Sequence, residues 1–143
     1  LDVNNKGSVS NEEVQEWIDA GYINYLGVSD NVREEIAKSD CIVLPSFYRE
    51  GTPRVLLEGA SMAKPIITTD NVGCRDVVDD GVNGYLCEVR NAKDLANKME
   101  MMINLSLDSR IVLGKRGREK MRREFDESII IKRYLEVITK ILK

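Results

Sequence analysis

Two short apolar runs on either side of a helical pattern constrain the fold more than any other feature. Residues 41–45 read CIVLP and residues 65–69 read PIITT. Brief, wholly apolar runs are typical of strands that are buried on both faces of a parallel sheet. Strands that alternate with helices predict parallel βαβ units. We therefore expect an α/β fold with a doubly wound parallel sheet of the Rossmann type.

The remaining elements follow the same plan. We expect strands at 23–26 and 85–89 as well, and a capping box formed by Ser10 and Glu13 at the start of a first helix. Further helices are expected at 32–37, 53–63, 75–78, 92–105, 108–124 and 126–142. Thr52 is expected to be the N-cap of the helix at 53–63. Four strands correspond to the later half of a doubly wound domain. We expect residues 1–143 to be one partial domain, truncated at its N-terminus.

Composition excludes several classes of function. The formal net charge of −3 argues against a nucleic-acid partner, which usually requires a basic surface. The sequence contains no histidine, which removes His-based triads and most zinc sites. Its three cysteines form no C-x-x-C pair, and we expect buried thiols in a reducing compartment. No apolar stretch is long enough to span a bilayer.

The stretch REGTPRVLLEGASMAKP, residues 49–65, holds two glutamates with seven residues between them, Glu50 and Glu58. It follows a predicted strand, and ligands of such folds bind beyond the carboxyl ends of the strands. The loop then enters the start of a helix, where free N–H groups and the helix dipole favour anionic or oxygen-rich ligands. Gly51 allows a ligand to approach the backbone. A ligand with hydroxyl and phosphate groups fits this pattern.

Both glutamates also have explanations that require no ligand. A carboxylate just before a helix N-terminus is electrostatically favourable by itself. Glu58 can be a solvated helix residue, although the apolar surroundings of its helix make an unpaired buried carboxylate costly. The spacing alone does not decide between these alternatives.

The segment from LPSFYREGTPRVLLEGASMAKPIITTD through GCRDVV to DGVNGYL resembles the donor-binding half of retaining glycosyltransferases of family 4, which have the two-domain GT-B fold. Glu50 and Glu58 match the family's E-x7-E motif. The other segments match the family in order and spacing, so the resemblance covers nearly the whole chain. It is nearest to bacterial enzymes that extend lipid-linked or capsular polysaccharides.

The resemblance implies a role for each matched residue. Glu50 would act at the reacting face of the donor sugar as the catalytic glutamate, together with Gly51 and Thr52. Glu58 would bind the ribose hydroxyls. The start of the helix would approach the sugar and the diphosphate through the backbone of Pro53, Arg54, Val55 and Leu56. The loop after YINYLG would border the base with Gly27, Val28 and Ser29.

The resemblance further implies transfer of a hexose or N-acetylhexosamine, with retention of configuration, from a UDP-sugar to a glycan or lipid-linked acceptor. No cofactor and no metal are expected, which agrees with the lack of a D-x-D pair. It implies a cytoplasmic location, including the inner face of the membrane, and peripheral membrane contact by the intact protein. The diphosphate-binding basic residues and the acceptor domain would lie upstream, so this piece alone would be inactive.

Two other classes of function stay open. The chain could be a non-catalytic nucleotide- or anion-binding module that retains the fold, or part of a GT-B sugar-nucleotide epimerase.

Three further features have two interpretations each. The basic run RIVLGKRGREKMRR at 110–123 predicts either a contact with anionic lipid or a solvated face balanced by acidic neighbours, and we favour the second. Arg75 would face the sugar or acceptor, or would pair with Asp76 or Asp79. The apolar face of the last helix would pack toward a missing N-terminal domain or stay exposed and promote self-association.

Overall fold

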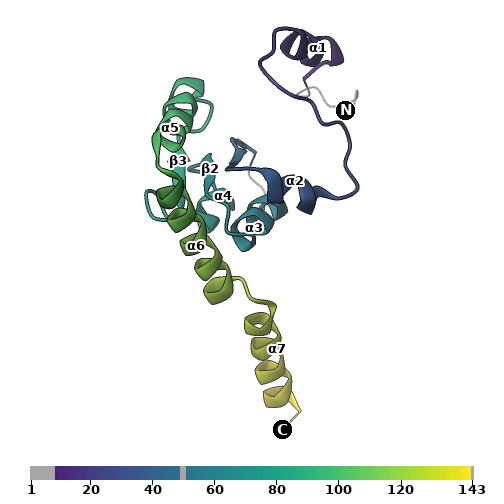
Figure 1. Ribbon diagram of the computed structural model, residues 1–143. Coiled ribbons are helices and arrows are strands. Elements are labelled where there is room, and N and C mark those ends of the chain that lie inside the picture. Colours follow the sequence, from purple (N-terminus) through teal and green to yellow (C-terminus); the bar gives the residue numbers. More distant parts are fainter. Residues whose placement is uncertain (1–8, 49–50, 143) are drawn as a thin grey trace. The chain divides into compact units, whose positions relative to one another are not determined.

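The structure is a computed structural model that describes residues 9–48 and 51–142 (Figure 1). Contacts divide the chain into two units, residues 1–32 and 33–143.

The described part of the first unit contains helix α1 (Asn11–Asp19). The predicted capping box is present: Glu13 N–H donates to Ser10 Oγ at 3.1 Å, and Ser10 N–H donates to Glu13 Oε2 at 3.0 Å. The strand predicted at 23–26 is wrong, because these residues have no regular structure and are exposed. A short extended run forms a strand only where its N–H and C=O groups pair with a neighbour, and among the described residues this run has no strand partner.

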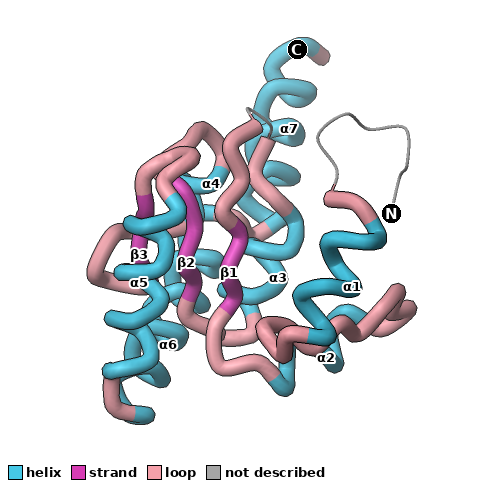
Figure 2. Tube along the Cα trace, turned by 90° about the horizontal axis from the view of Figure 1, so that it is seen from above, coloured by secondary structure: helices cyan, strands magenta, loops and turns pink. Residues whose placement is uncertain are grey.

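The second unit is built on a sheet of three parallel strands in the order β1–β2–β3 (Figure 2). They are β1 (Ile42–Leu44), β2 (Ile66–Thr69) and β3 (Gly84–Cys87). Across the sheet, Val43 pairs with Ile67, which in turn pairs with Tyr85. These positions confirm the strands expected at 41–45 and 65–69, and the one near 85.

Six helices accompany the sheet, and their starts follow ordinary capping chemistry. Asn91, Ser106 and Asp126 accept hydrogen bonds from backbone N–H groups in the first turns of the last three helices. The helices are α2 (Val32–Lys38), α3 (Arg54–Ser61), α4 (Cys74–Val77), α5 (Ala92–Asn104), α6 (Leu107–Glu124) and α7 (Glu127–Ile141).

Helices cover both faces of the sheet, because adjacent residues of β2 point to opposite sides. Ile66 packs in one cluster with residues of α3 and α4, including Leu56 and Val77. Ile67 packs in a second cluster with Met102 of α5 and Leu113 of α6. This arrangement confirms the α/β class with a parallel sheet buried on both faces.

The cysteines form no disulfide in the described part of the chain. Burial raises the pKa of the Cys41 thiol to about 11, so that it stays neutral at physiological pH.

No helix among the described residues has both the length and the apolar composition needed to cross a bilayer.

Helix α6 lies directly against the turn between α3 and β2. A Cβ atom on Gly114 would come within 1.9 Å of the Ala63 carbonyl oxygen. A Cβ atom on Gly117, one turn later, would lie 3.8 Å from its nearest neighbours, which is an ordinary contact. Only Gly114 therefore has to be glycine for this packing.

We predict that Gly114→Ala lowers the free energy of unfolding by about 3 kcal/mol or more, because the methyl group would overpack against backbone that cannot move aside freely. Gly117→Ala is the matched control, and we expect it to raise stability by roughly 0.5–1 kcal/mol through its better helix propensity. Urea unfolding of both variants measures the difference. Equal destabilisation by the two substitutions would contradict the proposed close approach.

Candidate functional site

The carboxyl ends of the three parallel strands meet at one edge of the sheet. A pocket of about 240 Å³ opens at this edge. Its lining residues follow or end each strand and continue into α5: Pro45, Thr69, Cys87, Glu88, Arg90, Asn91, Ala92 and Leu95. Parallel α/β proteins bind ligands at this edge.

Side chains at and just after the end of β2 fasten the loop that leaves β1. Thr69 Oγ1 donates to the Ser46 carbonyl oxygen. The amide nitrogen of Asn71 donates to the Tyr48 carbonyl oxygen at 3.0 Å, and its own oxygen accepts from Val72 N–H at 2.9 Å. Asn71 is buried, so these bonds hold the loop in a fixed position at the site.

A residue that follows β3 contacts the same loop from the other side. The Arg90 guanidinium lies 4.2 Å from the centre of the Phe47 ring, which is a cation–π distance. The Phe47 and Tyr48 rings are in turn 4.0 Å apart. Arg90 has a φ of 60°, a left-handed conformation that costs a non-glycine residue energy and is found where surrounding structure enforces it. The loop after β1 is thus held by residues that follow both other strands.

The start of α3 lies one residue later than the sequence suggested. Pro53, and not Thr52, is the N-cap, with extended backbone (φ −63°, ψ 128°). The reason is that Pro53 O, and not Thr52 O, accepts the first helical bonds, from Leu56 and Leu57 N–H at 3.1 and 3.3 Å. A proline side chain has no hydrogen-bonding group, so the N–H groups of Arg54 and Val55 have no side-chain cap from this residue. Such a helix start suits an anionic ligand.

Glu58 lies on the face of α3 opposite Leu56 and Ala60, which belong to the core. Its carboxylate is 3.6 Å from the Arg54 guanidinium, one turn back, and its side chain is 31% exposed. Helical side chains tilt toward the N-terminus, so Glu58 leans toward the uncapped first turn. An exposed pair of this kind contributes at most about 0.5 kcal/mol, so it leaves the carboxylate available to a ligand.

The other predicted site residues fall in different settings. Glu50 lies outside the described residues, so its catalytic role stays a prediction. Gly51 is exposed and Thr52 half-buried at the entry to α3. The Leu56 side chain is fully buried and its N–H donates within the helix start, so it offers a ligand no side-chain contact. The ligand roles of these residues and of Val55 stay predictions.

Gly27, Val28 and Ser29 belong to the first unit. Gly27 has a φ of 73°, Val28 is 94% exposed, and Ser29 Oγ accepts from Asn31 N–H at 3.2 Å just before α2. Their role beside the base stays a prediction.

Arg75 pairs with a different carboxylate from those predicted. Its Nε lies 3.1 Å from Asp70 Oδ1, and it also donates to the Asp70 carbonyl oxygen at 3.0 Å. Asp70 directly follows β2, so the pair braces the loop that carries Asn71. Asp79, one of the expected partners, instead binds Lys120 at 2.6 Å.

Sequence reasoning missed the residues that hold the loop, namely Thr69, Asn71, Phe47 and Arg90. The polar run TTDN that closes β2 was a usable indication, because side chains at the carboxyl ends of neighbouring strands lie close together. Nothing in the sequence pointed to the contact between Phe47 and Arg90, which are far apart in the chain. Within the described residues, no group of three acidic, Cys or His side chains is placed to hold a metal ion.

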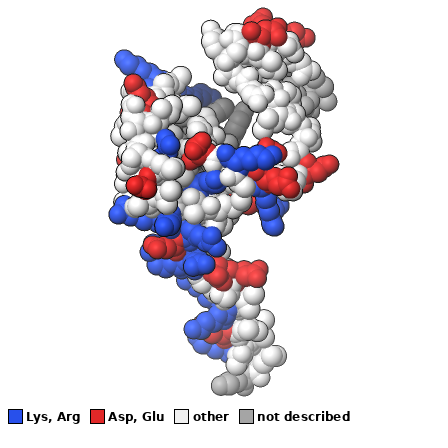
Figure 3. All heavy atoms as spheres, in the orientation of Figure 1, with Lys and Arg blue, Asp and Glu red and all other residues white. Residues whose placement is uncertain are grey.

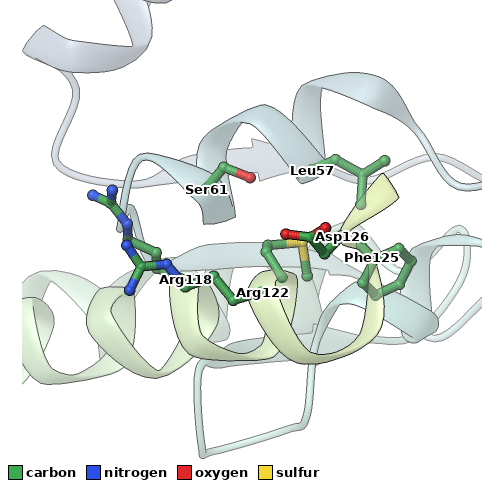
Figure 4. Close-up of a pocket in the computed structure, with 7 residues that line it drawn as sticks. Leu57, Ser61, Arg118, Arg122, Phe125 and Asp126 are labelled. Carbon is green, nitrogen blue, oxygen red and sulfur yellow. The ribbon is translucent and has the colours of Figure 1, made fainter. Parts of the chain in front are cut away.

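A second pocket, of about 260 Å³, lies between α3, α6 and the start of α7 (Figure 4). Leu57, Met121 and Phe125 supply apolar surface, and Ser61, Arg118, Arg122 and Asp126 supply polar groups. In Figure 4 the two arginine side chains extend away from Phe125 and Asp126. The pocket adjoins the outer face of α6 and not the carboxyl ends of the strands.

Comparison with known proteins identifies the family. The model of the family described as "Glycosyl transferases group 1" matches residues 5–104, more than half of the chain. This chain belongs to the group 1 glycosyltransferase family. The match confirms the resemblance to glycosyltransferases of the GT-B fold that the motifs indicated.

Two curated relatives show the range of the family. The glycosyltransferase chain is 31% identical over 128 residues to N,N'-diacetylbacillosaminyl-diphospho-undecaprenol alpha-1,3-N-acetylgalactosaminyltransferase of Campylobacter jejuni, covering 90% of this chain and 33% of the relative. It is 33% identical over 121 residues to N-acetyl-alpha-D-glucosaminyl L-malate synthase of Bacillus anthracis, covering 83% of this chain and 31% of the relative. The chain thus spans about a third of the length of these relatives.

Solved structures show the same fold. A glycosyltransferase from Rickettsia africae superposes with a TM-score of 0.81 at 24% identity, covering 92% of this chain and 35% of that protein. HepE of Anabaena, crystallised in complex with UDP, superposes with a TM-score of 0.79 at 20% identity, covering 90% of this chain and 35% of HepE.

We predict that Asn71→Asp releases the loop after β1. The substitution keeps the oxygen that accepts from Val72 N–H, but replaces the donor to Tyr48 by a carboxylate oxygen that faces a carbonyl. Loss of one buried hydrogen bond should cost about 1–3 kcal/mol of stability. Hydrogen exchange of residues 44–48 should accelerate, whereas Asn97→Asp, on the exposed side of α5, should leave it unchanged. Unaltered exchange in the Asn71 variant would contradict the fastening role.

Proposed function

We propose that this chain is the donor-binding part of a retaining glycosyltransferase. It would bind a nucleoside-diphosphate sugar, with UDP as the nucleotide, and the intact enzyme would move a hexose or N-acetylhexosamine to a glycan or lipid-linked acceptor. One observation carries the proposal. The uncapped start of α3, with the partly exposed Glu58 one turn later, follows directly on the loop after β1, which Asn71 fixes at the carboxyl edge of the parallel sheet.

This geometry matches the chemistry of a sugar nucleotide. Departure of a nucleoside diphosphate develops negative charge, which backbone N–H groups at a helix start stabilise. The N–H groups of Arg54 and Val55 are available for that purpose. The Glu58 carboxylate can accept two hydrogen bonds from the vicinal hydroxyls of a ribose. Glu50, in the loop before Gly51, would contact the donor sugar.

The activities for which the relatives are named support the choice of donor and acceptor. The Campylobacter relative is an N-acetylgalactosaminyltransferase that acts on a diphospho-undecaprenol-linked sugar, and HepE binds UDP. We infer a similar donor and a lipid-linked or glycan acceptor for the intact protein. We further infer that transfer needs no metal and occurs in the cytoplasm, where sugar nucleotides are available.

The Glu58 role predicts a loss of nucleotide affinity. Glu58→Gln in the intact protein should weaken UDP binding by roughly 10–100-fold, as expected for hydrogen bonds to a charged group. Glu35→Gln is the matched control, because Glu35 is 33% exposed and also pairs with a cation on its own helix. Calorimetry with UDP measures both. Equal affinities for the two variants would remove Glu58 from the nucleotide site.

The Glu50 role predicts a loss of turnover. Glu50→Gln in the intact protein should lower the rate of UDP release from the UDP-sugar by roughly 100-fold or more, the range found when one preorganised group at a developing charge is removed. Glu100→Gln, on the exposed side of α5, should retain full activity. Full activity of the Glu50 variant would reject the catalytic role.

The same assay separates the other two classes of function. An intact protein that binds UDP yet releases none from any UDP-sugar in the presence of acceptor would be a binding module. Conversion of a UDP-sugar without an acceptor would indicate an epimerase.

A further inference from the structure

Two aromatic rings and one guanidinium group form a continuous stack at the carboxyl edge of the sheet. The Arg90 guanidinium lies 4.2 Å from the centre of the Phe47 ring, and the centre of the Tyr48 ring lies 4.0 Å from that same centre. One face of a ring has room for only one group at van der Waals distance, so Arg90 and Tyr48 cover opposite faces of Phe47. Tyr48 is therefore the outer member of the stack.

The outer face of the Tyr48 ring is open to solvent. Tyr48 is 54% exposed although Phe47 covers one face of its ring, whereas Phe47 between its two neighbours is 37% exposed. Within residues 9–48 and 51–142, the Tyr48 hydroxyl forms no hydrogen bond with another residue. The ring thus offers a ligand a flat apolar face with a polar group at its edge.

This ring is held in place by the protein itself. The carbonyl oxygen of Tyr48 accepts a hydrogen bond from the buried Asn71 amide at 3.0 Å, and Arg90 fixes the Phe47 ring behind it. Arg90 has left-handed backbone with a φ of 60°, a conformation that surrounding structure has to enforce. A ligand that stacks on Tyr48 therefore loses little free energy in ordering the side chain, which is how a prearranged site gains affinity.

The chemistry of the open face favours a neutral ring over an anion. The face of an aromatic ring carries partial negative charge, which repels phosphate and attracts polarised C–H groups. Lys and Arg side chains gather over α6 (Figure 3), and no residue of α6 lines the pocket at the strand ends. In that pocket Arg90 is offset by the carboxylate of Glu88. A pyranose, with C–H groups on one face and hydroxyls around its rim, fits this surface.

Tyr48 also lies at the sugar end of the donor site, and this step rests on the proposed function. There Glu58 binds the ribose, the N–H groups of Arg54 and Val55 meet the diphosphate, and the donor sugar lies before them. Tyr48 comes three residues before Gly51, so its Cα lies within roughly 11 Å of that loop position, about two sugar rings away. A nucleotide base would bind beyond the ribose, at the other end. The ring in reach of Tyr48 is therefore the acceptor's.

From these observations we propose that the open face of Tyr48 is an acceptor subsite on which a pyranose ring of the acceptor stacks. Phe47 and Arg90 are positioning residues that support the ring from behind. Stacking covers the C–H face of the sugar and leaves the hydroxyls on its rim free, so that one of them can face the donor sugar. An axial hydroxyl on the stacked face would separate the two rings, so the subsite selects pyranoses with a face free of axial hydroxyls.

The test is saturation-transfer NMR of the intact protein, saturated with UDP, in the presence of the methyl β-glycosides of glucose, galactose, N-acetylglucosamine and N-acetylgalactosamine. We expect at least one glycoside to bind, with the strongest transfer to the C–H protons of one ring face. Tyr48→Ala and Tyr48→Leu should each weaken this binding roughly 10-fold, because both remove the aromatic face. Tyr48→Phe keeps that face and should preserve binding. Calorimetry should show the same UDP affinity in all three variants.

Met101→Ala is the matched control, because Met101 is 47% exposed on α5 and has no contact with the stack. It should bind the glycoside as the unaltered protein does. UDP binding without binding of any glycoside would overturn the subsite alone, whereas absence of UDP binding would reject the proposed function and the subsite with it. Unchanged glycoside binding in Tyr48→Ala, or equal loss in Tyr48→Phe, would also overturn the subsite. Loss of UDP affinity in Tyr48→Ala would overturn it by assigning the ring to the base.

Discussion

The parallel pairing of β2 with both of its neighbours is the constraint on which the rest of the structure depends. Because β1, β2 and β3 run in the same direction, their carboxyl ends meet at one edge, and every loop that leaves this edge is brought to the same place. The buried side chains of β2 alternate between two faces, and each face is covered by helices. The sheet thereby fixes the position of the start of α3 relative to the loops after β2 and β3.

Hydrogen bonds at this edge convert a loop into a defined surface. Thr69 and Asn71 donate to the Ser46 and Tyr48 carbonyl groups of the loop after β1, and Arg90 lies on the ring of Phe47. Buried amide and hydroxyl donors fix a loop more firmly than an exposed ion pair does, because an unsatisfied buried group is costly. A sugar nucleotide would then meet a prearranged set of N–H groups at α3 and lose less free energy in ordering the site.

Helix α6 packs closely against the rest of the domain. Its inner side needs glycine at position 114, where the helix contacts the turn between α3 and β2.

The sequence by itself determined the sheet class, two of the strands almost to the residue, the helices and the capping box of the first helix, because apolar periodicity and capping chemistry are local. It also placed Glu58 within the helix that follows the loop after β1. Only the tertiary structure decided what depends on contacts distant in the chain: the unpaired run at 23–26, the pairing of Arg75 with Asp70, and the fastening of the loop by Asn71 and Arg90. A strand needs a partner and an ion pair needs a neighbour in space, and neither is written in the local sequence.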